Sequence, residues 1–315
     1  MPTLRDKFAI FIASRICLNP EKKDRVIKKL KAAQKIGVKW ATPNFKTTRH
    51  DLPDGGKYEL AKPKKEKRQR NKLIMHIHGG VFIMGLTNIF RNLAPVYSKA
   101  ADGAAVLTLD YRTAPAFTYP TAHDDMRQAW QEATTVLGYN PKDIVLVGDS
   151  AGANLILSLL LKLRNECLPL PAAAVTMSPW ADLLATGNSY TANYKNDVMM
   201  GRKKSKLDLE ENRQTLLNCG LFAYAKDADR ADPYLSPLYG DYHNLPPILM
   251  TAGGHELLLD DTLTIAQKIK DAEGSVEVII GEGMFHSYPL FRTLSTTAKK
   301  DFGRIKEFIK YHLAD

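Results

Sequence analysis

The sequence predicts an α/β protein with a mostly parallel central sheet flanked by helices. Two observations support this prediction. Six short apolar runs recur along the 315 residues, and apolar residues at helical spacing separate most of them. Alternation of buried strands with helices is typical of parallel sheets that are covered on both faces. A chain of this length suits one large domain with additions, and needs no disulfide or metal to stabilise it.

The six apolar runs are expected as strands in chain order. They are residues 73–78, 104–109, 144–147, 172–177, 248–252 and 276–280. Helices are expected at 25–36, 124–137, 151–165 and 262–272, where apolar residues recur every three or four positions. In such sheets the chemistry lies in loops at the carboxyl ends of the strands. The residues that follow each run are therefore the candidates for function.

Two segments outside this pattern are expected to form a helical cap. Residues 1–42 are the N-terminal cap segment, and residues 43–315 form the catalytic domain. Residues 181–231 form a cap insertion, because a crossover between the fourth and fifth strands does not need this length. The apolar stretch 8–18 is interpreted as a helix face. It has no small-residue cleavage site after it and is too short to span a bilayer.

Composition and charge exclude several classes of function. The formal net charge is +10, and residues 62–72 carry much of it. This segment has no interleaved aromatic residue for base stacking, so we expect a solvated loop and no nucleic-acid partner. Contact of the first helix with a membrane surface stays open but is not expected. Three widely spaced cysteines favour a reducing, cytoplasmic location and show no metal-binding pattern, so no metal is expected.

A candidate nucleophile lies between the third strand and the next helix. Residues 148–152 read Gly-Asp-Ser-Ala-Gly, which is a G-x-S-x-G pattern. Between a strand and a helix, this pattern predicts a turn so sharp that only small residues fit beside the serine. Ser150 would then project its hydroxyl near a helix N-terminus, which favours developing negative charge. We predict that Ser150 is a nucleophile rather than a helix cap.

Backbone amides that could hold an oxyanion are predicted after the first strand. His78-Gly79-Gly80 ends that strand, and glycine amides can approach a tetrahedral intermediate closely. Removing one such donor typically costs about 3–4 kcal/mol of transition-state stabilisation. We predict that Gly79 and Gly80 donate to the oxyanion together with Ala151, the residue after the nucleophile. His78 is expected to shape the loop rather than to catalyse.

A serine nucleophile needs a base near neutral pH, and His286 is the candidate. It follows the last strand, whereas His312 lies in a predicted final helix. The acid should follow the fifth strand and hold the imidazole. Glu256 is the preferred candidate because it lies nearest to the strand end. Asp260 remains the alternative, although it fits the start of the next helix, where a carboxylate caps free amides.

These residues lie in motifs that resemble one family, the hormone-sensitive-lipase-like carboxylesterases, also called the bacterial family IV esterases. The resemblance covers about residues 40–315. Its marks are His78-Gly79-Gly80, residues 110–115 and 148–154, Ser236-Pro237-Leu238, Leu245-Pro246-Pro247 and Phe285-His286. Two departures stand out. Val81 replaces the usual third glycine after His-Gly-Gly, and the family's acid is most often Asp where this chain has Glu256.

The resemblance implies an α/β-hydrolase fold with an N-terminal helical cap. It implies hydrolysis of short- to medium-chain acyl esters by a serine carboxylesterase without a cofactor. It places two oxyanion glycines at Gly79 and Gly80, the nucleophile at Ser150 and the base at His286. A homodimer is expected from the resemblance alone. The small-molecule substrate would be an acyl ester, with Phe82, Met84, Leu216, Phe222 and Phe285 as candidate pocket residues.

Two alternative functions remain at this stage. An amidase or a deacetylase of a specific small metabolite would use the same triad, and only the pocket would distinguish it. A non-catalytic small-molecule-binding homologue would keep the fold but lose the catalytic histidine. Because His286 is present, the sequence favours an enzyme. Its predicted mechanism is acyl transfer through an acyl-enzyme at Ser150, with His286 as base and then acid.

Overall fold

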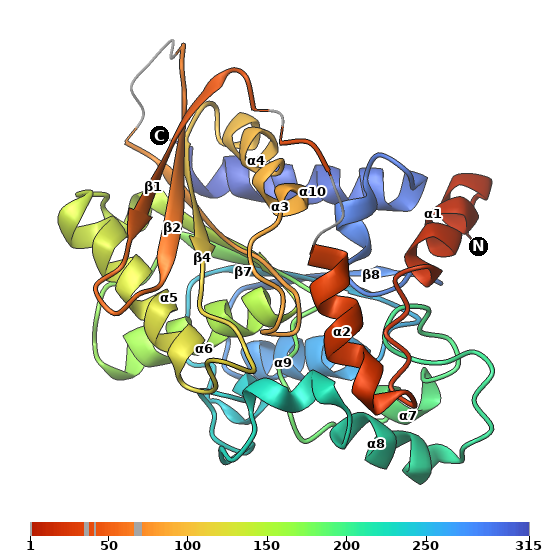
Figure 1. Cartoon of the computed structure of the whole chain (residues 1–315). Coiled ribbons are helices and arrows are strands. Elements are labelled where there is room, and N and C mark those ends of the chain that lie inside the picture. The colour runs from red at the N-terminus through yellow and green to blue at the C-terminus, as the bar shows by residue number, and fades with distance from the viewer. Residues whose placement is uncertain (1, 35–37, 41, 66–70, 315) are drawn as a thin grey trace.

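The computed structural model in Figure 1 describes residues 2–34, 38–40, 42–65 and 71–314. Its centre is an eight-stranded sheet with the order β1-β2-β4-β3-β5-β6-β7-β8. The strands are β1 (Phe45–Asp51), β2 (Lys57–Pro63), β3 (Leu73–Ile77), β4 (Ala105–Asp110), β5 (Ile144–Asp149), β6 (Ala173–Met177), β7 (Ile248–Gly253) and β8 (Val276–Gly281). β1 and β2 are antiparallel to their neighbours, and the other pairs are parallel. All six predicted strands are present.

Helices cover both faces of the sheet, as the predicted fold class requires (Figure 1). The α-helices are α1 (Leu4–Ser14), α2 (Lys23–Gln34), α3 (Asn88–Arg91), α4 (Ala94–Ala100), α5 (Thr121–Gln131), α6 (Ala151–Asn165), α7 (Ser189–Ala192), α8 (Leu209–Leu217), α9 (Leu259–Asp271) and α10 (Thr296–His312). α4 and α10 pack on one face, whereas α6 and α9 pack on the other. A separate apolar cluster fills each of the two interfaces. The last two residues of the helix expected at 25–36 lie outside the described residues.

The antiparallel edge has one local signal in the sequence, which is its turn. Asp54-Gly55-Gly56 joins β1 to β2, but the strands themselves lack a continuous apolar run. β1 is an edge strand that alternates half-buried and exposed residues, so its sequence can be polar. β2 buries Glu59 between the guanidinium groups of Arg49 and Arg91. Lys62 lies in β2, and residues 66–70 of the basic segment lie outside the described residues.

The two segments expected as a cap lie on the same side of the molecule (Figure 1). α2 contacts the 3₁₀ helix Gly220–Tyr224, and the backbone amide of Leu18 donates to the Met199 carbonyl over 2.7 Å. α7 and α8 belong to the segment between β6 and β7. Among the described residues, the chain forms no helix long and apolar enough to cross a bilayer.

Candidate active site

Ser150 alone makes the turn between β5 and α6. Its φ of +52° lies in a region that side chains rarely adopt, which is typical of a sharp strand-to-helix turn. A Cβ atom on Gly152 would lie 2.2 Å from the Ile77 carbonyl oxygen. A Cβ atom on Gly148 would lie 2.9 Å from the Gly152 carbonyl carbon. Both glycines are therefore required by close backbone contacts, and they allow Ser150 to occupy the turn.

The loop after β3 lies against this turn. The amide of Gly79 donates to Asp149 Oδ1 over 3.0 Å, so the residue before Ser150 holds the loop in place. Burial raises the pKa of Asp149 to about 6, although the nearby His286 charge and this hydrogen bond oppose the increase. Gly80 and Val81 follow with φ of +117° and +61°. Within the described chain, no hydrogen-bond acceptor faces the amides of these two residues.

His78 shapes this loop, as predicted. Its ring is fully buried, and its Nδ1 lies 2.7 Å from the Gly79 carbonyl oxygen. It stacks on Tyr111 at 4.4 Å between ring centroids, and the Tyr111 hydroxyl donates to the His78 carbonyl. Burial lowers the pKa of His78 to about 4, so the ring is neutral near pH 7. His78 is therefore a neutral, buried side chain that supports the loop after β3 by packing and hydrogen bonding.

The histidine and the acid of the predicted triad lie together. His286 Nδ1 lies 3.4 Å from Glu256 Oε2, and both side chains are buried. Burial alone would lower the pKa of His286, but the adjacent Glu256 carboxylate outweighs burial and raises the pKa. The Ser287 amide donates to the Ser178 hydroxyl, and the Ser150 amide donates to the Met177 carbonyl, so the loops that carry His286 and Ser150 both bond to the chain at the end of β6. A buried histidine whose pKa is raised by a carboxylate suits proton transfer near neutral pH.

Asp260, the alternative acid, occupies a different position. Its Oδ2 accepts the Ser189 amide over 2.9 Å, while its own amide donates to the Ser189 hydroxyl. It therefore joins the start of α9 to α7, as its position at a helix start suggests. Glu256 is fully buried and faces His286, so the geometry favours Glu256 over Asp260.

Known proteins share this fold and sequence. Residues 74–290 match a family model described as alpha/beta hydrolase fold. An esterase of Acinetobacter venetianus is 35% identical over 78% of this chain and 76% of its own length. An acetyl-hydrolase of Streptomyces hygroscopicus is 35% identical over 70% of this chain and 69% of its own length. The crystal structure of an esterase from the bacterial hormone-sensitive lipase family is 27% identical, covers 100% of both chains and has a TM-score of 0.81.

The chain belongs to the hormone-sensitive-lipase-like esterases. Its α/β-hydrolase fold and its family are thereby confirmed. The positions of Ser150, His286 and Glu256 follow from the structure of this esterase. Their catalytic roles remain predictions, which the proposal below addresses.

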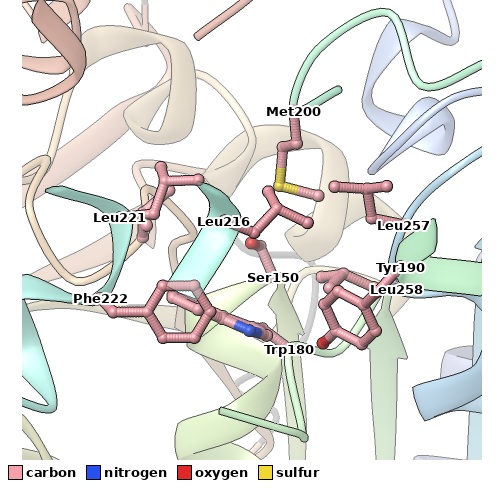
Figure 2. A pocket seen from close by; sticks show the side chains of 10 residues that line it. Ser150, Trp180, Tyr190, Met200, Leu216, Leu221, Phe222, Leu257 and Leu258 are labelled. Carbon is pink, nitrogen blue, oxygen red and sulfur yellow. The ribbon is translucent and has the colours of Figure 1, made fainter. Parts of the chain in front are cut away.

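A small apolar pocket opens onto Ser150 in this esterase (Figure 2). The volume of this cavity is about 20 Å³. Its lining comes from the loop after β3, the segment between β6 and β7 and the loop after β7: Val81, Trp180, Tyr190, Met200, Leu216, Leu221, Phe222, Leu257 and Leu258. Leu216 and Phe222 had been expected here. Phe82 and Phe285 instead pack on Tyr224 and Phe291, and Met84 is also absent from the lining.

Sequence reasoning missed Ser178 in the esterase site. The Ser178 hydroxyl donates to Glu256 Oε2 over 2.7 Å and accepts the Ser287 amide over 2.8 Å. One hydroxyl thus joins the acid to the residue after His286. Ser178-Pro179 directly follows β6, and Ser150 directly follows the neighbouring strand β5, so the position of Ser178 after a strand end was the available signal.

Proposed function

We propose that this esterase hydrolyses short- to medium-chain acyl esters through an acyl-enzyme at Ser150. His286 removes the Ser150 proton as the hydroxyl attacks the ester carbonyl, and then protonates the leaving alcohol. Water releases the acid by the same steps in reverse. Glu256 holds the imidazole and stabilises its charged form. The observation that carries this proposal is the buried His286–Glu256 pair, which Ser178 joins to the end of β6, where the Ser150 amide also bonds.

We propose a revised set of oxyanion donors. The amide of Gly79 points to Asp149, so it supports the loop instead of facing the substrate. The amides of Gly80 and Val81 come next and are unpaired within the described residues. Ala151 is the first residue of α6, so its amide has no hydrogen-bond partner within the helix. We infer that Gly80, Val81 and Ala151 hold the oxyanion.

The acyl group is inferred to be short because the pocket is narrow and apolar. Apolar side chains favour an alkyl chain over a charged or sugar-like acyl group. The cap residues Met200, Leu216 and Leu221 close over Ser150, so a long acyl chain would have to displace them. This supports acetate to butyrate as the preferred range, and agrees with an acetyl-hydrolase among the relatives.

The test is hydrolysis of p-nitrophenyl esters from acetate to palmitate by wild type and Ser150→Ala. We expect turnover of short esters by wild type and a loss of at least about a thousandfold in the variant. Ser158→Ala, another buried serine on α6, is the matched control and should retain activity. Appreciable turnover by Ser150→Ala would refute the nucleophile. Cleavage of p-nitroacetanilide without ester cleavage would identify an amidase.

A further inference from the structure

The outer face of α1 is an apolar stripe. The side chains of Leu4, Phe8 and Phe11 are 85%, 53% and 51% exposed. Residues at this spacing lie on one side of an α-helix, so the three form one continuous surface. α1 lies at the edge of the molecule, at the right of Figure 1. Two phenylalanines exposed next to each other on one helix are unusual for a surface that faces only water.

The exposed charged residues of α1 and its C-cap are all positive. Arg5, Lys7 and Arg15 are exposed, and the Arg15 guanidinium lies 4.6 Å from the Phe11 ring centroid. The one acid in α1, Asp6, is fully buried on the opposite side. An apolar stripe between cations fits a surface that is both hydrophobic and negatively charged.

α1 is firmly attached to the body of the protein. Asp6 accepts hydrogen bonds from the Ser295 hydroxyl and from both the amide and hydroxyl of Thr297, at the start of α10. It also completes a capping box with Thr3. The Arg5 guanidinium donates to the Thr293 carbonyl over 2.8 Å. The stripe is therefore presented by a fixed helix with its other face already packed.

The packed face of α1 contacts the loop that carries the proposed base. Ala9 and Ala13 share an apolar cluster with Phe285 and Tyr288, which flank His286 in sequence. The segment after α1 bonds to Met199, next to the pocket residue Met200. Whatever binds the stripe therefore lies one helix away from the active site.

We propose that the α1 stripe, Leu4, Phe8 and Phe11 with Arg5, Lys7 and Arg15, docks the esterase onto an anionic lipid surface. Each basic side chain near such a surface attracts it, while the exposed rings enter the interface. A second copy fits less well, because pairing the stripe with itself would bring like charges together. Docking would place the site where apolar esters concentrate. This consequence rests on the proposed function, whereas docking itself does not.

The test is sedimentation with vesicles of phosphatidylcholine alone and of an equimolar mixture with phosphatidylglycerol. Ser150→Ala can serve as the parent protein, so the result is independent of turnover. We expect it to prefer the mixed vesicles by at least about tenfold, as two or more basic contacts would give. Lys7→Gln with Arg15→Gln should lose this preference. Phe8→Gln with Phe11→Gln should lose binding to both vesicles.

The matched control exchanges exposed apolar residues elsewhere. Val136→Gln with Leu263→Gln removes side chains that are 69% and 43% exposed on other helices, and should bind like the parent. Equal binding of parent to both vesicles, or equal binding of the Phe8 and Phe11 variant and the control, would overturn the proposal. The proposal would also be overturned if light scattering showed that the parent and the control are dimers and the Phe8 and Phe11 variant is a monomer. In the wild-type background, this variant should still hydrolyse p-nitrophenyl acetate in buffer.

Discussion

Val81→Gly tests how the loop after β3 sets the size of the acyl pocket. Val81 replaces the glycine that the family resemblance predicts here, and its φ of +61° is rare for a β-branched residue. Its side chain is 7% exposed and lines the pocket beside Ser150. The chain therefore keeps a strained valine at a position where glycine would be relaxed. We infer that the side chain itself restricts the substrate.

The structure sets the expected magnitudes. The space of the valine side chain would hold about two methylene groups of substrate, each contributing about 0.8 kcal/mol when buried. The octanoate-to-acetate ratio of kcat/KM should therefore rise by roughly tenfold. For stability, losing valine burial costs about 1.5–3 kcal/mol and glycine's chain entropy about 0.5–1 kcal/mol. Relief of left-handed strain returns about 1–2 kcal/mol, so we expect a net loss of about 1–2 kcal/mol.

The assay compares p-nitrophenyl acetate, butyrate and octanoate in wild type, Val81→Gly and Val81→Ala. The alanine variant is the matched control, because it adds room but keeps a Cβ atom at positive φ. If the Val81 side chain limits the substrate, both variants should raise the octanoate-to-acetate ratio of kcat/KM. In urea unfolding, only Val81→Gly should gain stability from relief of the left-handed strain. An unchanged ratio in both variants would refute the role of the Val81 side chain. A uniform fall for all esters would instead indicate that the side chain orients the Val81 amide.

Two further predictions concern the acid and its support. Glu256→Gln should lower kcat/KM by about a thousandfold or more, whereas Asp260→Asn should stay near wild type. Because Glu256 raises the pKa of His286 and the base acts when neutral, activity falls as pH drops through that pKa. In Glu256→Gln the acid limb of the kcat/KM profile should therefore move to lower pH, and an unmoved limb would contradict the pairing. Ser178→Ala should lower kcat by about ten- to a hundredfold with little change in KM, because it misplaces the triad. Ser178→Thr, which keeps the hydroxyl, should restore part of the rate, and equal rates in all three would remove Ser178 from the site.

The sequence predicted the sheet well because its buried strands are continuous apolar runs. Continuous apolar runs at residues 144–147 and 248–252 predicted strands of a sheet covered on both faces, and these runs form β5 and β7. β1 was not predicted, because an edge strand needs little apolar surface and its residues alternate in exposure. Only the turn between β1 and β2 left a local signal.

The candidate site was predicted less completely because its partners are distant in sequence. Gly79 and Asp149 are seventy residues apart, so no local sequence pattern indicates that the Gly79 amide donates to Asp149. A buried carboxylate at a strand end does need donors, and this requirement was the available clue. The choice between Glu256 and Asp260 likewise depended on which one faces His286, since both lie within one short loop.

The segment between β6 and β7 supports the acid as well as lining the pocket. The Asn193 side chain donates to the Glu256 carbonyl, and Asp197 accepts the amide of Leu257. The same Asp197 carboxylate accepts the amide of Met200, whose side chain lines the pocket, and its charge helps to raise the pKa of His286. A cap that moved freely would lose these bonds. Asp197 therefore contributes both to the position of Met200 in the pocket and, after Glu256, to the raised pKa of His286, so its loss should affect both together.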